Sequence, residues 1–336
     1  MKWTCGTARA SIAGVVPPPR GGCSWTKVGS RLLLFGGADK HQQHFSDIYS
    51  FDITRKAWDK PQIGGTTPTP RSSHSTVRWK DSLLVFGGMN GEENVTFNDL
   101  FEFQSGVSYT MTWVKLPCHE GPPRNSHATV VIGSIMIIIG GASPQGLTND
   151  VFKCDLSDQD HLHFHAVHCT AAPPRKDLVG PRELEELPLP REMHSACLCP
   201  VQLNEHTEPS SSHEVLVMGG RTSAGVERSL FSLNIDSWQW TRLTDAPAPR
   251  CAHSACFLEN SAIMAIYGGW DGGTTIAGSL CLYDALAGIW TTVSIDPVPT
   301  GRFGHASCAI GKGEIYVFGG VNPCDDLTEV IILRAP

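Results

Sequence analysis

Six short apolar runs along the chain each end in a pair of glycines. The first glycines of these pairs are Gly36, Gly87, Gly140, Gly219, Gly268 and Gly319. Successive pairs therefore lie 51, 53, 79, 49 and 51 residues apart. A period in this range indicates one supersecondary unit that is repeated around or along an axis. We interpret the long interval as an insertion within the array, so that all six repeats are retained.

Alternating apolar and polar residues follow the glycine pairs. Segments 47–52 and 99–103 are examples, and in each case a tryptophan comes next along the chain. Alternation over such a length, bounded by Gly, Pro, Asn and Asp, is typical of a half-buried strand. Together with the apolar run before the glycines and a further stretch after a recurring arginine, the pattern predicts four short strands in each repeat.

The recurring arginine precedes every glycine pair, and in five repeats a histidine follows it by three residues. The arginines are Arg20, Arg71, Arg124, Arg191, Arg250 and Arg302. The histidines are His74, His127, His194, His253 and His305, and the first repeat has Cys23 instead. A position that recurs in every repeat usually serves the contact between repeats. We therefore expect the arginines to tie neighbouring repeats through backbone carbonyls and the histidines to be packing groups. The functional alternative is that the arginines form an electropositive ring that attracts anionic ligands.

Six glycine pairs with Arg, His and Trp at matching offsets resemble the kelch repeat over essentially the whole chain. The resemblance implies an all-β fold, a six-bladed β-propeller in which each blade is a twisted four-stranded antiparallel sheet around a central channel. The glycines have a steric reason in such a fold. Backbones crowd near the axis, and glycine tolerates both close approach and positive φ.

The two ends of the chain predict how the ring closes. In several repeats the tryptophan lies eleven residues after the residue that opens the third strand, as Trp58 follows Asp47. The same offset from Asp326 gives position 337, one past the final Pro336. The last blade therefore lacks its outer strand, and we expect the segment around Trp3 to supply it. Such closure covers an edge that would otherwise invite aggregation.

We expect one propeller domain over residues 1–336, with two inserts inside the long interval. Comparison of the internal landmarks places one insert at about 171–190, between blades three and four, and the other at about 204–212, within blade four. Since consecutive strands alternate in direction, the first insert shares a face with the loops after the glycine pairs. The second insert lies on the opposite face.

Composition narrows the partners and the compartment. The formal net charge of −7 argues against nucleic acid or an anionic membrane as the main partner. The chain starts without the apolar segment of a signal peptide, and its 12 cysteines follow no disulfide framework. We therefore expect a cytoplasmic protein, monomeric by itself, with no membrane span.

The loops after the glycine pairs differ strongly from one another, which is typical of a recognition surface on a fixed frame. Trp270 is a binding-anchor candidate in a Gly-rich loop, although it could equally pack against its own loop or a neighbouring blade. Arg221 could bind a carboxylate, or it could simply pair with Glu227. Kelch domains that capture acidic or C-terminal peptides use arginines around this mouth, and the resemblance extends that role to this chain. The predicted ligand-binding set is Trp270, Asp271, Arg221, Asn90, Asn322, Arg71 and Arg302.

Metal and enzyme readings have weaker support. The densest histidine cluster is His161, His163, His165, His168 and Cys169. Phe164 takes the blade tryptophan position there, so the flanking histidines should face solvent, and we expect no metal site and no cofactor. A mutarotase-like enzyme acting on a sugar-type substrate is an alternative that the family allows, for instance with Glu92 and His41 as acid and base. The iron-binding Glu-x3-Asp-x3-Cys triad of the kelch specifier proteins is missing.

The sequence thus predicts a non-enzymatic scaffold whose channel mouth binds a peptide or loop of a partner protein. A substrate receptor of a ubiquitin ligase without its own adaptor module is a further alternative. The kelch family includes such receptors, but the sequence shows no dimerisation module, F-box or helix after the last blade.

Overall fold

A computed structural model describes residues 2–8, 15–105, 111–119, 121–172, 186–200, 213–311, 313–325 and 327–336. These residues form strands and no helix, so none of them forms a helix that could cross a membrane. The predicted insert at 204–212 and most of the one at 171–190 lie outside the described residues.

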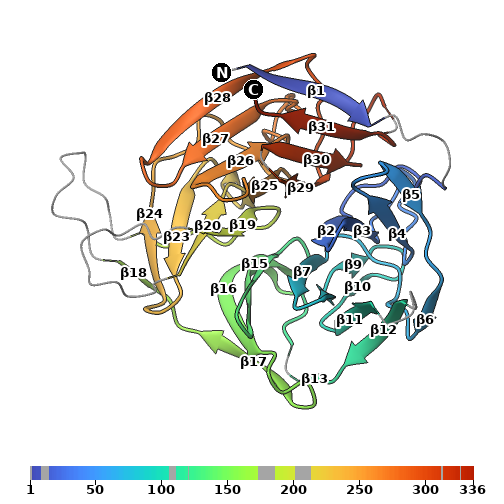
Figure 1. Ribbon diagram of the computed structural model, residues 1–336. Helices are drawn as coiled ribbons and strands as arrows, with labels where there is room; N and C mark the ends of the chain where they lie inside the picture. The colour runs from blue at the N-terminus through green and yellow to red at the C-terminus, as the bar shows by residue number, and fades with distance from the viewer. Residues whose placement is uncertain are drawn as a thin grey trace.

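Each glycine-pair repeat forms one four-stranded antiparallel blade (Figure 1). Blade 1 consists of β2 (Ser24–Val28), β3 (Arg31–Phe35), β4 (Ile48–Asp52) and β5 (Ala57–Asp59). Blade 2 consists of β7 (Ser75–Trp79), β8 (Ser82–Phe86), β11 (Leu100–Ser105) and β12 (Met111–Leu116). Blade 3 consists of β14 (Ala128–Ile132), β15 (Ile135–Ser143), β16 (Gly146–Asp155) and β17 (Leu162–Val167).

The second half of the chain repeats this order. Blade 4 consists of β19 (Ser195–Leu198), β20 (Glu214–Met218), β23 (Leu230–Asn234) and β24 (Gln239–Arg242). Blade 5 consists of β25 (Ser254–Phe257), β26 (Ile263–Tyr267), β27 (Leu280–Asp284) and β28 (Ile289–Asp296). Blade 6 consists of β29 (Ala306–Ile310), β30 (Glu314–Phe318), β31 (Val330–Arg334) and, from the other end of the chain, β1 (Lys2–Ala8).

The N-terminal strand closes the ring, as predicted. β1 pairs antiparallel with β31, from Thr4 opposite Arg334 to Ala8 opposite Val330. Trp3 is 1% exposed, and Cys5, two residues later, pairs with Leu333 in the register in which Trp58 pairs with Phe51 in blade 1. The two termini therefore lie side by side in blade 6 (Figure 1), and the kelch-propeller prediction is confirmed.

Short strands link the blades at their outer edges, and others form hairpins in two of the loops. β6 (Ile63–Gly65) runs parallel to β12, β13 (Cys118–His119) to β17, and β18 (Thr170–Ala171) to β24. The end of β28 runs parallel to β1 in the same way. Two hairpins follow glycine pairs, namely β9 (Met89–Asn90) with β10 (Val95–Thr96) and β21 (Arg221–Thr222) with β22 (Gly225–Val226).

The core is divided among the six interfaces between blades. One apolar cluster fills each interface, including the one between blade 6 and blade 1. Trp58 of blade 1, for example, packs edge-on against Phe318 of blade 6 with ring centroids 5.0 Å apart. Because every blade buries one face against each neighbour, closure of the ring buries the faces that blades 1 and 6 would otherwise expose.

A circle of backbone hydrogen bonds surrounds the channel where the innermost strands begin. Six residues, one from each blade, adopt positive φ between 51° and 63°. Each donates its N–H to the carbonyl of its counterpart in the preceding blade, at 2.7–2.9 Å. The members of the circle are Gly22, Ser73, Ser126, Met193, Ala252 and Gly304. These bonds fix the relative positions of the blades at the mouth.

Candidate functional site

We call the side of the ring that carries the loops after the glycine pairs and the connections between blades the loop face. The opposite side, which carries the other strand turns, is the turn face. On the loop face the predicted site has two parts. The first is a frame, formed by the six repeated arginines and the five repeated histidines, and the second is the set of variable loops that follow the glycine pairs.

The frame arginines are buried and fully engaged. Arg71 is representative: it donates to the Gly87 carbonyl at 2.9 Å and to both carboxylate oxygens of Asp99 at 2.6 and 3.1 Å. Its guanidinium also lies 4.0 Å from the centre of the Phe97 ring. All these partners belong to its own blade, so the side chain ties the first, second and third strands of one blade together. The expected link between neighbouring blades is therefore not made by this side chain.

The link between blades comes from the backbone of the same residues. The Arg71 carbonyl accepts the N–H of Gly37 from blade 1, at 2.9 Å. A Cβ on Gly36 would lie 2.7 Å from that carbonyl oxygen, and its φ of +64° is also unfavourable for other residues. The predicted steric reason for the glycine pairs is confirmed.

The arginine ring does not make the mouth electropositive. All six side chains are at most 5% exposed. Arg20, Arg71, Arg124 and Arg302 pair with Asp47, Asp99, Asp150 and Glu329 respectively. Arg71 and Arg302, two of the predicted ligand-binding residues, thus lie within the frame beneath the surface.

Blades 4 and 5 replace the frame carboxylate by an uncharged partner. Arg191 donates to the hydroxyl of Ser229 at 3.0 Å, and Arg250 to the thiol of Cys281 at 3.5 Å. Burial lowers the pKa of Arg191 to about 10. Among the described residues, the two frame arginines under the loops that carry Arg221 and Trp270 therefore form no ion pair, although the charges of Glu227 and Glu186 act on Arg191.

The histidine ring joins neighbouring blades, as predicted. The Nε2 atoms of His74, His127, His253 and His305 hydrogen-bond serine hydroxyls of the preceding blade at 2.8–2.9 Å. That of His194 bonds the Ile139 carbonyl at 3.1 Å. The ring lines an axial cavity of about 150 Å³ together with the circle of backbone hydrogen bonds.

Burial keeps these histidines neutral. It lowers the pKa of His74, His194 and His305 to about 3, with a smaller effect from the adjacent arginine. It holds the pKa of His127 and His253 well below 6.5. A neutral, hydrogen-bonded imidazole suits a packing role.

Trp270 lies half-buried on the loop face. Its indole N–H donates to the Gly273 carbonyl of its own loop at 2.9 Å, so that polar group is satisfied. The Asp271 carboxylate accepts the N–H groups of Gly273 and Thr275 at 2.8 and 3.0 Å, and these bonds lower its pKa. Asp271 therefore shapes the loop that presents the Trp270 ring.

Arg221 pairs with Glu192 and not with Glu227, the partner considered from the sequence. Its Nε donates to Glu192 Oε1 at 2.8 Å, and a second guanidinium nitrogen bonds the same oxygen. This contact raises the pKa of Arg221, while half of its side chain remains exposed. A Cβ on Gly272 would lie 2.7 Å from the side chain of Val226, so the Trp270 loop leans on the hairpin that begins at Arg221.

The two predicted asparagines hold loops. Asn90 is buried, and its Oδ1 accepts the N–H groups of Glu92 and Glu93. Asn322 donates to the Gly301 carbonyl at 2.6 Å and caps the N–H of Cys324. Asn322 also lines a recess of about 40 Å³ between blades 6 and 1.

Sequence reasoning missed three residues at the mouth. Glu192, Cys251 and Phe303 each follow a frame arginine, and each pairs by backbone hydrogen bonds with the residue after a glycine pair. Phe303 and its partner Val321 place apolar side chains beside the Trp270 blade. The position after the arginine varies in every repeat, and that variability was the available signal.

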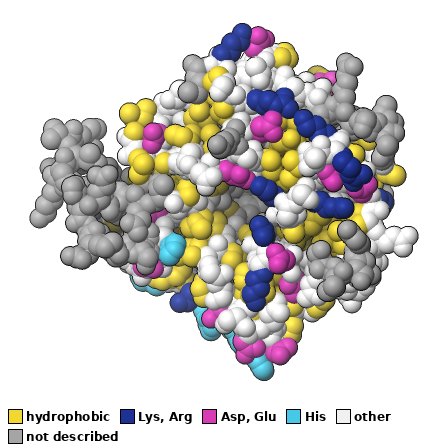
Figure 2. Space-filling view, in the orientation of Figure 1, with side chains coloured by type: hydrophobic (Ala, Val, Ile, Leu, Met, Phe, Trp, Pro, Cys, Tyr) yellow, Lys and Arg dark blue, Asp and Glu magenta, His cyan; other side chains and the backbone are white. Residues whose placement is uncertain are grey.

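Apolar side chains gather on the loop face more than on the turn face. Among the described residues, seven of nine exposed large hydrophobic side chains lie in loops of this face, namely Val15, Val16, Val95, Leu187, Leu189, Val298 and Val321. Where side chains are coloured, Figure 2 shows Lys and Arg interspersed with Asp and Glu, so no broad field of one sign covers the face it presents.

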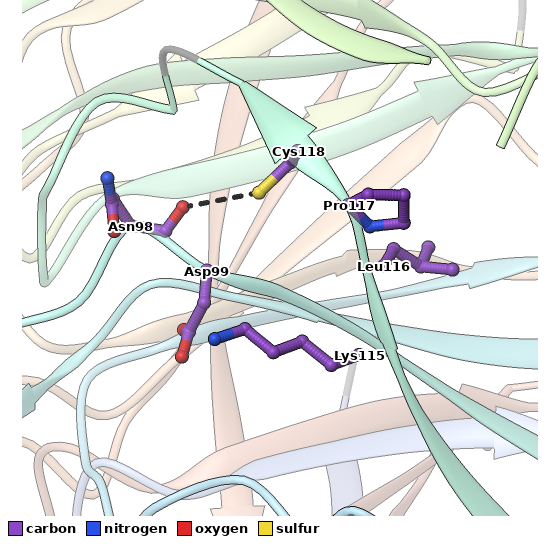
Figure 3. Close-up of a pocket in the computed structure, with 6 residues that line it drawn as sticks. All are labelled: Asn98, Asp99, Lys115, Leu116, Pro117 and Cys118. Atoms are coloured by element: carbon purple, nitrogen blue, oxygen red, sulfur yellow. Dashed lines mark hydrogen bonds between the residues drawn. The ribbon is translucent and has the colours of Figure 1, made fainter. Parts of the chain in front are cut away.

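A larger recess of about 310 Å³ lies at the rim of blade 2, between the start of β11 and the end of β12 (Figure 3). Asp99 and Lys115 line one side, and the Cys118 thiol donates to the Asn98 carbonyl at 3.6 Å on the other. None of the predicted ligand-binding residues lines it.

The histidine cluster around β17 and the proposed acid–base pair do not line the mouth cavity. Phe164 is buried on β17 while His163 and His165 are exposed, as expected. His163 stacks on His119 of β13 at 5.2 Å, but the described residues contain no group of three or more potential ligands that could hold a metal ion. Glu92 and His41 are both exposed on separate loops.

These features define a kelch-repeat β-propeller with a rigid frame and a variable loop face. The chain belongs to the KLHDC2/KLHL20/DRC7 Kelch-repeats domain family, whose model matches residues 1–179 and 205–335.

The chain is similar to several longer proteins. It is 25% identical over 305 residues to the leucine-zipper-like transcriptional regulator 1 homolog of Drosophila melanogaster, covering 86% of this chain and 28% of that protein. It is 26% identical over 334 residues to human host cell factor 1, covering 92% and 15%. It is 25% identical over 354 residues to host cell factor homolog hcf-1 of Caenorhabditis elegans, covering 91% and 40%. The chain thus spans less than half of the length of each of these relatives.

Proposed function

We propose that the loop face binds a partner protein, with a peptide or loop of the partner seated at the mouth. One observation carries this proposal. The partly exposed indole of Trp270 and the half-exposed side chain of Arg221 lie on touching loops, above Arg191 and Arg250, the two frame arginines that form no ion pair among the described residues. Trp and Arg are among the residues that are enriched as interface anchors.

Each predicted residue has a distinct part in this proposal. Trp270 offers an apolar surface, and Arg221 offers charge-assisted hydrogen bonds to a carboxylate of the partner. Asp271 and Asn322 hold and flank the loops that touch the ligand. Asn90, Arg71 and Arg302 act indirectly by fixing the frame, because their side chains are buried.

The size of the mouth cavities favours a protein ligand over a small molecule. The axial cavity and the recess beside Asn322 have volumes of about 150 and 40 Å³. Small-molecule sites are usually about 300–1,000 Å³ and enclose most of their ligand. An extended peptide or loop can instead lie across the loop face and contact its exposed apolar side chains.

The compartment and the assembly state follow as further parts of the proposal. All twelve cysteines are free thiols, which suits a reducing compartment such as the cytoplasm. We place the protein there as a monomer that binds its partner through the loop face.

The test compares the mouth with a matched control on the turn face. The tagged wild type, a Trp270→Ala/Arg221→Ala variant and a Trp238→Ala/Arg55→Ala control are used to capture partners, which are quantified by mass spectrometry. Trp238 and Arg55 lie in strand turns of the other face, where Trp238 is partly exposed like Trp270 and Arg55 is exposed, so the control removes the same kinds of group. We expect the mouth variant to lose its specific partner by about tenfold or more, and the control to retain it.

If the two double variants recovered equal amounts of the partner, the mouth would not be the binding site and the proposal would be wrong. Turnover of a sugar by the wild type, with no protein recovered, would favour the enzyme alternative. Thermal unfolding of each variant shows that any loss does not come from unfolding.

A further inference from the structure

The outer edge of blade 5 lacks a covering strand that the structure provides on four other blades. On blades 2, 3, 4 and 6 a short parallel strand, supplied by the preceding blade, runs beside the outermost strand near its tryptophan position. In blade 4, Thr170 and Ala172 donate their N–H groups to the carbonyls of Trp238 and Trp240 at 3.1 and 2.7 Å. The outer edge of a kelch blade in this protein is therefore built to accept a parallel strand.

Blade 4 does not supply that strand to blade 5. Only 10 residues separate Trp240 from Arg250, against 11 to 27 for the corresponding connections after blades 1, 2, 3 and 5. The connection turns back onto its own blade, where Leu243 and Ala246 donate to the carbonyls of Leu230 and Arg228. Its contact with β28 is through a side chain, since the Trp290 indole donates to the Thr244 carbonyl at 2.8 Å.

The backbone of β28 consequently has an unpaired edge along its first half. Trp290 pairs with Tyr283 in the register in which Trp240 pairs with Leu233, so its N–H and C=O point outward, as do those of Thr292. β1 covers only Ser294–Asp296 of this edge. Among the described residues, Trp290 and Thr292 have no strand partner beyond β27, and β28 lies at the rim of the ring (Figure 1).

The side chains of this edge lack the usual protection against pairing. No charged residue occurs between Asp284 and Asp296. The outer strands of the other blades carry charged or titratable side chains, namely Lys2, Asp59, Lys115, His163 and Arg242. Ile289 is 59% exposed and Leu286 is 61% exposed, while Trp290 is less buried than the tryptophans of the covered blades. Natural proteins normally protect exposed edges with charge, proline or a bulge.

We propose that the edge of β28 from Gly288 to Thr292 is a second protein-binding site, which takes an extended, uncharged segment of a partner as a parallel fifth strand of blade 5. Backbone hydrogen bonds to Trp290 and Thr292 supply affinity, and an apolar or β-branched residue of the partner covers Ile289 and Leu286. The site is separate from the loop-face mouth and does not depend on it.

A phage-displayed library of random linear peptides provides the probe. The library is panned on the wild-type propeller and depleted on a Thr292→Pro variant, which removes one outward N–H from an edge where proline is tolerated. We expect uncharged, β-branched peptides that bind the wild type and lose about tenfold or more in affinity for Thr292→Pro. The Thr292→Val variant keeps the N–H and should bind as the wild type does. Trp270→Ala/Arg221→Ala should also bind normally, which separates this site from the mouth.

Hydrogen exchange on the wild type gives a readout that does not depend on any variant folding. The amides of Trp290 and Thr292 should exchange rapidly in the free protein and slowly with a selected peptide bound. Peptides that bind Thr292→Pro equally well, or no enrichment after depletion, would overturn the proposal. Sedimentation of the free wild type as a dimer, with these amides already protected, would instead assign the edge to a second copy of the chain.

Discussion

Mild acid should destabilise the propeller, because the ring histidines are buried as neutral groups. The pKa of His74, His194 and His305 is lowered by burial to about 3, whereas in the unfolded chain each returns to about 6.5. Between these values the unfolded state binds a proton that the folded state does not. The free energy of unfolding therefore falls as the pH falls through 6.5 and goes on falling until about pH 3.

The size of this effect follows from the pKa difference. Well below pH 6.5 each histidine contributes a slope of about 1.4 kcal/mol per pH unit, and integration from pH 7 to pH 5 gives about 1.9 kcal/mol. The three histidines together should lower the free energy of unfolding by about 6 kcal/mol over this interval. That is a large part of the roughly 5–15 kcal/mol that stabilises a typical domain. Carboxylates with ordinary pKa values near 4 add little in this range.

Urea unfolding followed by tryptophan fluorescence at several pH values between 7 and 5 measures the slope. A His74→Cys variant introduces the residue that blade 1 carries as Cys23, so the repeat already accommodates it. We expect this variant to be less stable at pH 7 but to show a slope that is shallower by about 1 kcal/mol per pH unit on average between pH 7 and pH 5. Replacement of the exposed His41 by Gln serves as the control and should leave the profile unchanged. A free energy of unfolding that stays constant from pH 7 to pH 5, or an unchanged slope in His74→Cys, would refute the reasoning.

Three further predictions concern the frame and the closure of the ring. Trp3→Ala should lower the free energy of unfolding by about 3–5 kcal/mol and the melting temperature by about 4–7 °C. Trp290→Ala should have a smaller effect, because Trp290 is less buried. Equal losses in calorimetry would contradict the closure argument. Asp99→Ala leaves the Arg71 guanidinium buried without a counterion and should cost about 3–5 kcal/mol in chemical unfolding, and a loss below 1 kcal/mol would show that the ion pair is dispensable. Gly88→Ala should destabilise strongly or prevent soluble expression, since its Cβ would lie 2.8 Å from the Ser72 carbonyl oxygen at a φ of +95°.

Much of the architecture could be predicted from the sequence because it depends on local regularities. Period-two alternation places Phe164 inward and its neighbours outward, whatever the surroundings. A glycine that needs positive φ is also visible locally, and six such pairs with constant offsets fix the number of repeats. The offset from the third strand to the tryptophan also predicted that the last blade lacks its own outer strand. A closed ring needs that strand, and the segment around Trp3 was the part of the chain left to supply it.

The partners of individual side chains could not be predicted in this way. Arg221 bonds Glu192, 29 residues away, because backbone pairing brings the residue after the arginine beside the residue after the glycines. The guanidinium of Arg71 turns back to Asp99 of its own blade, while its carbonyl reaches the neighbouring blade. The sequence offsets are equally compatible with a partner in the same blade and with a partner in a neighbouring blade. Only the path of the chain in space distinguishes the two.

The sequence by itself determined the six-fold repeat, the strands and the closure, since these arise from short-range patterns of side-chain polarity and backbone freedom. The tertiary structure decided which charges are buried and paired, which loops after the glycine pairs touch each other, and which blade edge is left without a covering strand. Those properties depend on distances between residues far apart in the chain, and such distances are set only when the blades pack into a ring.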